Sequence, residues 1–229
     1  MIYITGDTHI PIDSDKLLPE NFPKGSMLDE NDYLIILGDF GGVWDRKSEE
    51  HAKWIKFLSS RRYTTLFVDG NHENFDLLNS YKVESWCGGK VHHIAKNVIH
   101  LMRGQVYNID KTSIFTFGGG FSKDKDRRIP HISWWSEEMP SAEEYDEGMK
   151  NLKKAGFMVD YILTHTAPLS VISRFFTPFG EVKLNRYLSE VDRLTSYKKW
   201  YFGHVHEDVA VDDRHVAVYD KIIELGETL

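Results

Sequence analysis

The sequence predicts a mixed α/β sandwich, and three patterns support this fold class. Short runs rich in β-branched and aromatic residues, the composition of buried strands, recur along the chain. Segments with the helical spacing of apolar residues lie between some of these runs. Two further stretches resemble hairpin turns, which favours mixed sheets over a purely parallel sheet.

Strands are expected at six places. Five of them end at a short polar motif and span Ile2–Thr5, Tyr33–Leu37, Thr64–Val68, Tyr161–Thr164 and Trp200–Phe202. The sixth, Thr112–Phe117, ends at three consecutive glycines. The expected hairpin turns lie around Asn108–Lys111 and Asp212–Arg214.

Three helices can be placed from the sequence. Segments Ser48–Ser60 and Glu181–Arg193 each carry apolar residues along one face. Ser141, followed three residues later by Glu144, is a capping box that opens a third helix, which ends near Gly156.

One domain is expected over residues 1–229. The 229 residues with 41% apolar content suffice for one buried core, and no Pro- or Ser-rich linker divides them. Cys87 is the only cysteine, so no intrachain disulfide is expected and nothing suggests an oxidising compartment. The first strand leaves no room for a signal peptide, and no apolar stretch approaches the length of a membrane span. We therefore expect a cytoplasmic protein without membrane contact.

Polar motifs follow the five strands named first. They are Asp7-Thr8-His9, Gly38-Asp39, Gly70-Asn71-His72, His165 and Gly203-His204-Val205-His206. In layered α/β proteins, side chains at the carboxyl ends of strands gather in one crevice. We therefore expect these five motifs to meet.

The motifs together supply oxygen and nitrogen ligands for metal ions. Asp7 and His9 would project from the same face of an extended segment, and the two oxygens of Asp39 could bridge two ions. Asn71 offers a neutral oxygen. Imidazole nitrogen comes from the later histidines, His165, His204 and His206. Imidazole suits Mn, Fe, Co, Ni or Zn better than Mg or Ca.

Two such ions would bind the oxygens of a phosphoryl group, activate a shared water and stabilise the charge that develops during in-line attack. His72 is then free to face the substrate. A protonated imidazole there could donate to the leaving oxygen or to a phosphoryl oxygen.

The ordered set Asp-x-His, Gly-Asp, Gly-Asn-His-Glu, an isolated His and Gly-His-x-His resembles the calcineurin-like metallophosphoesterase family over residues 7–206. The resemblance implies a four-layer α-β-β-α sandwich with two mixed β-sheets. It implies one metal held by Asp7, His9, Asp39 and His206. The second metal would be held by Asp39, Asn71, His165 and His204, with His72 and Asp39 as catalytic residues. Two divalent ions, Mn, Fe or Zn with Mn favoured, are the implied cofactors.

The chain departs from the family pattern at one position. The family often has a second Asp three residues after the bridging Asp, where this sequence has Gly42. That Asp usually supports the site without ligating, so the expected ligand set is unchanged, although the subfamily is harder to assign.

Other polar residues near the motifs have two interpretations. Arg127 and Arg128 could hold a substrate phosphate or belong to a solvated charge run. Trp134 and Trp135 could stack on a base or sugar, or plug the space against a neighbouring helix. Asp69 and Glu73 could orient ligand imidazoles or be solvated loop charges. The remaining histidines, His51, His92, His93, His100, His131 and His215, are expected at the surface or in the core.

The expected function is hydrolysis of a phosphomonoester or phosphodiester by a metal-bound hydroxide, with His72 assisting the leaving group. The sequence does not choose between monoester and diester. A catalytically silent metal-binding scaffold is the alternative, and a protein serine/threonine phosphatase is an alternative among enzymes. The net charge of −7 argues against a broad nucleic-acid surface, so we expect a small phosphorylated substrate, with nucleic acid only as a substrate at the metal cleft.

Overall fold

The computed structural model describes all residues, 1–229, and contains two β-sheets packed face to face. The first sheet has seven strands. In spatial order they are β13 (Ile223–Glu224), β1 (Ile2–Thr5), β2 (Tyr33–Leu37), β3 (Thr64–Val68), β6 (Val98–Leu101), β5 (Gly89–Ala95) and β4 (Val83–Trp86). Strands β1, β2, β3 and β6 are parallel, and the others pair antiparallel at the two sides, so the sheet is mixed.

The second sheet has six strands and is also mixed. Its order is β11 (Val209–Ala210), β12 (His215–Ala217), β10 (Lys199–Phe202), β9 (Tyr161–Thr164), β8 (Thr112–Phe117) and β7 (Gln105–Ile109). The central four strands are parallel, while β7 and β11 pair antiparallel at the edges. Residues up to 101 build all of the first sheet except β13, and residues 105–217 build the second.

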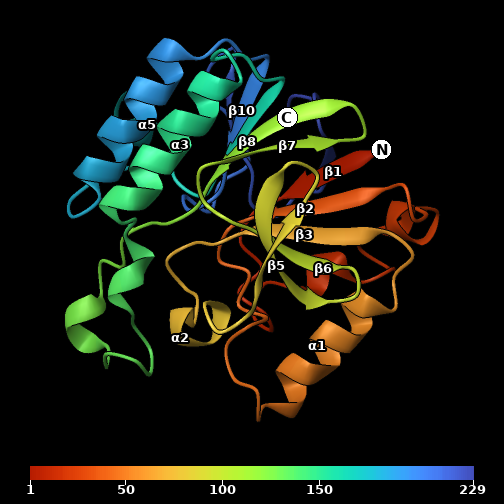
Figure 1. The fold of residues 1–229 in the computed structure, drawn as a ribbon. Helices are drawn as coiled ribbons and strands as arrows, with labels where there is room; N and C mark the ends of the chain where they lie inside the picture. Colours follow the sequence, from red (N-terminus) through yellow and green to blue (C-terminus); the bar gives the residue numbers. More distant parts are fainter.

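Helices cover the outer faces of both sheets. Figure 1 shows α1 (Glu49–Ser59) and α2 (Phe75–Leu78) beside the first sheet, with α3 (Ala142–Lys154) and α5 (Val182–Leu194) over the second. The remaining short helices are α4 (Leu169–Ile172) and four 3-10 turns, η1 (Asp15–Leu17), η2 (Pro23–Ser26), η3 (Lys125–Arg127) and η4 (Ser136–Glu138). None of the helices combines the length and the apolar character that crossing a bilayer requires.

Alternation along the strands creates three apolar layers. In β2, Ile35 and Leu37 face the 16-residue cluster between the sheets, whereas Leu34 and Ile36 face the cluster beneath α1. In β10, Tyr201 faces the same central cluster, and Trp200 faces the cluster under α3 and α5. Because both faces of each sheet are buried, these strands are almost continuously apolar in sequence.

The four-layer sandwich of two mixed sheets is confirmed. The six expected strands lie where the sequence predicts them, with β10 beginning one residue earlier, and both hairpin turns occur. Ser48 caps α1, and Ser141 with Glu144 forms the capping box of α3. The sequence patterns do not predict β4, β5 and β6.

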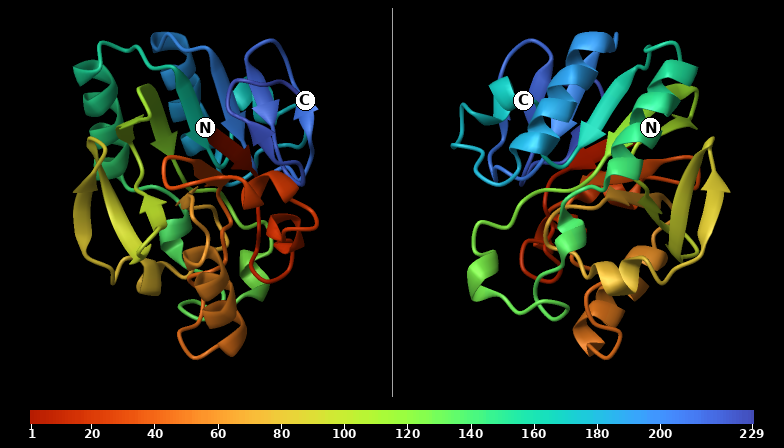
Figure 2. Two further views of the ribbon diagram at one scale, coloured as in Figure 1. Left: turned by 90° about the vertical axis from the view of Figure 1, so that its right-hand side faces the viewer. Right: turned by 60° about the vertical axis from the view of Figure 1, so that its left-hand side comes forward.

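The segment between β8 and α3 leaves the second sheet and reaches the side where α1 and α2 lie, as the green trace in Figure 2 shows. Trp135, in this segment, is buried and packs edge-on against Trp44 at 5.3 Å. Its indole Nε1 donates to Asp76 Oδ2 of α2 at 2.7 Å. Trp135 is therefore a plug in the core.

Candidate metal centre

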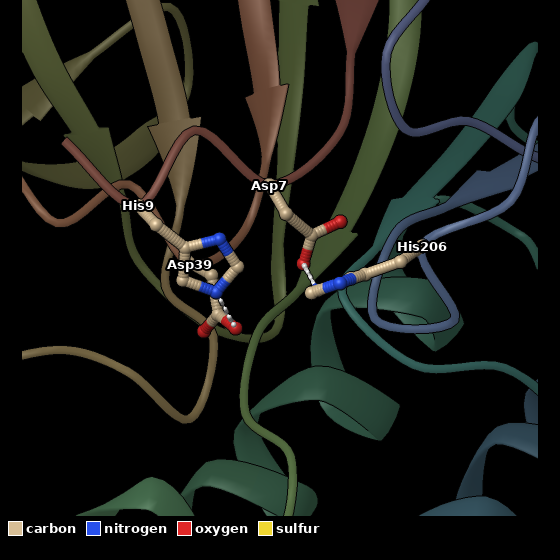
Figure 3. A group of neighbouring side chains, drawn as sticks. All are labelled: Asp7, His9, Asp39 and His206. Carbon is tan, nitrogen blue, oxygen red and sulfur yellow. Dashed lines mark hydrogen bonds and ion pairs between the residues drawn. The ribbon is translucent and has the colours of Figure 1, made fainter. Parts of the chain in front are cut away.

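Four predicted site residues meet where the parallel strands end. Asp7, His9, Asp39 and His206 each offer one ligand atom, and these atoms lie within 4.8 Å of one another (Figure 3). His9 Nε2 lies 3.1 Å from Asp39 Oδ2, and His206 Nε2 lies 3.8 Å from Asp7 Oδ1. The first three residues follow β1 and β2, whereas His206 follows β10, so the group joins the two sheets.

The other predicted ligands lie beside this group. His165 Nε2 is 3.2 Å from Asn71 Oδ1 and 3.5 Å from Asp39 Oδ1, so these three residues converge. The ring of His204 is 4.8 Å from that of His165, but its Nε2 faces Glu181 Oε2 at 3.2 Å. The structure thus brings Asn71, His165 and Asp39 together, and it places His204 next to them in contact with a carboxylate that the sequence did not single out.

Two glycines allow the carboxylates to approach the backbone. A Cβ at Gly203 would lie 2.6 Å from Asp7 Oδ2, and one at Gly70 would overlap Asp39 Oδ1. Such distances leave no room for a side chain. The glycines next to the polar motifs therefore have a packing reason.

Four of the predicted ligands have a left-handed backbone conformation. Positive φ angles occur at His9 (36°), Asp39 (46°), His204 (67°) and His206 (54°). The left-handed region is unfavourable for residues with a Cβ, and such conformations gather where function needs a fixed geometry. The strand ends are thus bent so that these side chains point into one site.

The pKa values reflect two buried carboxylates in a narrow space. Burial opposes ionisation of Asp39, but the charge and hydrogen bonds of His165 and His9 hold its pKa well below the usual range. Burial would lower the pKa of His9, yet the hydrogen bond and charge of Asp39 raise it to about 9. The charge of Asp39 likewise outweighs burial at His165 and raises its pKa to about 10. The group therefore favours positive charge, which a bound divalent cation can supply.

Contacts behind the histidines fix which ring nitrogen faces the centre. His9 Nδ1 lies 2.8 Å from Asp13 Oδ2, and His165 Nδ1 lies 2.9 Å from the Leu37 carbonyl. If Nδ1 donates in each case, Nε2 presents its lone pair to the centre, as in many protein metal sites. The donor set thus fits a divalent metal ion.

A buried lysine supports the first motif from behind. Lys16 is 7% exposed, and its Nζ donates to the carbonyl oxygens of Gly6 and Asp7 at 3.1 and 3.0 Å. Burial lowers the pKa of this amine, partly opposed by the charge of Asp7. No sequence pattern signals this role, because Lys16 lies in an apparently ordinary polar turn.

Asp69 and Glu73 are not solvated loop charges, and neither contacts a predicted ligand imidazole. Both are 1% exposed. Asp69 accepts from Arg103 Nε at 2.8 Å and lies 3.1 Å from His100 Nε2. Glu73 accepts from the backbone N–H of Phe40 at 2.7 Å, so it holds the turn that follows Asp39. Glu73 therefore supports the backbone after a motif, whereas the Asp69 carboxylate pairs with the buried side chains of Arg103 and His100.

A cleft of about 550 Å³ opens from the group. His72 lines it, and its backbone N–H donates to Asp39 Oδ1 at 2.7 Å. Arg128 also lines the cleft, whereas Arg127 is exposed on η3 and lies outside the lining. The remaining lining residues are His9, Ile10, Pro11, Ile12, Asp13, Gly41, Trp44, His51 and His206.

Comparison with known proteins agrees with this arrangement. A family model described as calcineurin-like phosphoesterase matches residues 1–208 of the 229. A search of curated proteins finds no match. The matched region includes every strand that contributes a residue to the group and every polar motif. The chain therefore belongs to the calcineurin-like phosphoesterase family.

Proposed function

We propose that this chain is a phosphoesterase that uses two divalent metal ions to hydrolyse a small phosphorylated substrate. The observation that carries the proposal is the group Asp7, His9, Asp39 and His206, whose ligand atoms lie within 4.8 Å and which opens directly into the cleft that His72 lines. Family membership supports metal-dependent phosphoester chemistry at this place.

The proposed ligands fall into two sets that share Asp39. Asp7, His9 and His206 complete the first set. Asn71, His165 and His204 would complete the second, for which the His204 ring, now in contact with Glu181, would turn toward the centre. The imidazole-rich donor set favours a transition metal, and Mn is our first choice. When bound, the ions supply Lewis-acid stabilisation of the phosphoryl oxygens and an activated water.

His72 is positioned for proton transfer. Its backbone is held by Asp39, so its ring stands at the boundary between the ligand group and the cleft. The His9 and His72 ring centroids are 5.4 Å apart. A substrate phosphoryl group beside His9 would thus lie within reach of the His72 imidazole, which donates a proton to the leaving oxygen.

Arg128 is proposed to bind a phosphoryl oxygen. Its Nε donates to Asp124 Oδ1 at 2.8 Å, and its Nη1 donates to the Ser133 carbonyl at 3.2 Å. These contacts hold the side chain at the cleft while leaving further N–H donors for an anion. Guanidinium presents a planar fork that matches phosphate oxygens.

The proposal is tested with 4-nitrophenyl phosphate and bis(4-nitrophenyl) phosphate in the presence of Mn²⁺, Zn²⁺ or Mg²⁺. Asp39→Asn should lose metal and activity together. His72→Ala should keep its metal and lose about 10²- to 10⁴-fold in kcat, the usual contribution of proton transfer. His93→Ala, on strand β5 and outside the cleft lining, is the control for removing a histidine.

Activity of both site variants within a few-fold of wild type would rule out the mechanism. A wild-type protein that binds two ions yet hydrolyses no mono-, di-, cyclic or nucleotide phosphate would instead be a metal-binding scaffold.

A further inference from the structure

Asn71 is the one proposed ligand with a side-chain amide, whose oxygen and nitrogen ends differ chemically. Its carbonyl oxygen can bind a cation, whereas its NH₂ group has only donors to offer. A rotation of the amide by 180° would therefore replace a ligand with a group that repels the ion. Asn71 Oδ1 lies 3.2 Å from His165 Nε2, so the oxygen faces the centre in this structure.

The opposite face of the amide contacts Ser122. Asn71 Nδ2 donates to Ser122 Oγ at 3.2 Å, and the two residues are 7% and 3% exposed. Neither side chain therefore has free access to water. A serine hydroxyl can donate or accept, so this contact selects the observed amide orientation only if the Ser122 proton points elsewhere.

Glu138, on η4, is a possible acceptor for the Ser122 hydroxyl proton. It is 1% exposed, and its Oε1 accepts from the Ser122 backbone N–H at 3.1 Å. Its Oε2 is buried and has no hydrogen-bond partner, so it is free to accept a further donor. Burial raises the pKa of Glu138, and the hydrogen bond from the Ser122 backbone N–H partly offsets this. Donation of the Ser122 hydroxyl proton to this unpartnered oxygen leaves Ser122 Oγ as an acceptor for Asn71.

The backbone around this contact is fixed from two sides. Gly120 N–H donates to the Glu138 carbonyl at 3.1 Å, and Arg103 Nη2 donates to the Glu137 carbonyl at 2.8 Å. A Cβ at Gly120 would lie 2.9 Å from Asn71 Oδ1. The lack of a side chain there leaves the oxygen side of the amide open, while the nitrogen side is closed by Ser122.

We infer that Ser122 and Glu138 are positioning residues that set the orientation of the Asn71 amide, so that its oxygen and not its nitrogen faces the metal centre. In this arrangement the Ser122 hydroxyl donates to the Glu138 carboxylate and accepts from Asn71 Nδ2. The inference rests on the proposed function, because it takes Asn71 as a ligand. It assigns roles to two residues that lie outside every polar motif of the sequence.

The test compares Ser122→Ala and Glu138→Gln with Ser136→Ala, which removes an exposed hydroxyl from the same segment. Mn²⁺ binding is measured by calorimetry, and folding by circular dichroism. Ser122→Ala should weaken one of two binding events by about 10- to 100-fold, the usual effect of losing a group that orients a ligand. The other event should change by less than about threefold, as expected for Asp7, His9 and His206, which Ser122 does not contact. Glu138→Gln should act in the same direction, because an amide can donate as well as accept.

An aspartate in place of Asn71 removes the need for orientation, since both of its oxygens can bind a cation. In the background Asn71→Asp, the further change Ser122→Ala should therefore cost less than about threefold in Mn²⁺ affinity. This double-mutant comparison separates a role in orientation from a general loss of packing.

Two outcomes would overturn the inference. One is a Ser122→Ala protein with both Mn²⁺ affinities unchanged, which leaves the proposed function intact. The other is an equal loss for Ser122→Ala in the wild-type and Asn71→Asp backgrounds. If wild type binds only one ion, the proposal of a two-ion centre fails. The side-chain amide resonances of Asn71 in the metal-free protein then test whether Ser122 and Glu138 orient this amide. They should shift in Ser122→Ala and not in Ser136→Ala, and unchanged resonances would contradict it.

Discussion

The backbone N–H of His204 donates to both carboxylate oxygens of Asp7, at 3.1 and 3.0 Å, across 197 residues of chain. Asp7 follows β1 of one sheet, and His204 follows β10 of the other. A carboxylate held in this way cannot rotate freely toward solvent. The contact thus fixes Asp7 within the candidate metal centre and joins the two sheets at the same point.

Replacing this carboxylate should weaken metal binding without unfolding the chain. In Asp7→Asn one oxygen still accepts from the His204 N–H, but the negative charge that favours a cation is lost. We expect Mn²⁺ affinity at the site formed by Asp7, His9, Asp39 and His206 to fall by at least about 10-fold, measured by calorimetry. Asp15→Asn, which changes an exposed carboxylate eight residues later, should leave both affinities unchanged. Equal binding by the two variants would contradict the role of Asp7.

Neighbouring arginines provide a matched pair for substrate binding. Arg128 lines the cleft and Arg127 does not. A hydrogen bond to a charged group contributes about 1.5–3 kcal/mol, so Arg128→Ala should lower kcat/KM for a phosphoester by about 10- to 100-fold. Arg127→Ala should stay within about twofold of wild type. Steady-state kinetics with unchanged metal content would check this, and similar losses in both variants would indicate a diffuse charge effect.

His92 should make a contribution to stability that is lost in mild acid. Burial, with the neighbouring His100, lowers the pKa of His92 to about 4, against an opposing effect of Asp69. Between pH 6.5 and about 4 the unfolded chain binds a proton at this residue and the folded chain does not. The contribution of His92 to the free energy of unfolding is therefore largest above about pH 6.5. It declines as pH falls, by up to about 1.4 kcal/mol per pH unit.

Urea unfolding between pH 7.5 and 4.5 measures this slope. His92→Gln should remove this contribution, so its stability should change less unfavourably toward low pH than that of wild type, whereas His93→Gln, one residue along the same strand, should behave as wild type. A wild-type slope in His92→Gln would show that other groups cause the acid sensitivity.

The left-handed backbone at His206 makes a prediction that does not depend on catalysis. Its φ is 54°, where a Cβ costs about 1–2 kcal/mol relative to glycine. His206→Gly and His206→Ala both lose the ring and its stacking on Tyr219, but only glycine relieves the backbone. In metal-free buffer, His206→Gly should therefore unfold at a higher urea concentration than His206→Ala. The reverse order would mean that the strain is absent in solution.

The sequence predicts most of the site residues that lie at the ends of strands. Polar residues directly after buried parallel strands, such as Asp39 after β2, have their positions determined by strand composition and by the common direction of the parallel strands. The same reasoning correctly places the hairpin around Asp110 and the capping box at Ser141. Local patterns suffice where one element positions one residue.

What the sequence does not reveal depends on contacts between distant loops. Arg127 and Arg128 are the same residue type in adjacent positions, and only the course of η3 decides which one enters the cleft. Glu138 and Lys16 look like ordinary surface charges, but tertiary packing buries both. Positive φ at His206 has no signal in composition, since it is imposed by the neighbouring chain.

The division of the chain between the two sheets has a consequence for how such proteins diverge. Sheet one comes almost wholly from residues up to 101, sheet two from residues 105–217, and the ligand group takes members from each. A chimera joined at residues 102–104 would combine half-sites from different parents. Each sheet supplies only part of the ligand group, so exchanging one sheet between relatives would change the shared centre. Chimeras of two relatives joined at this junction should therefore lose function even where the sheets themselves are interchangeable.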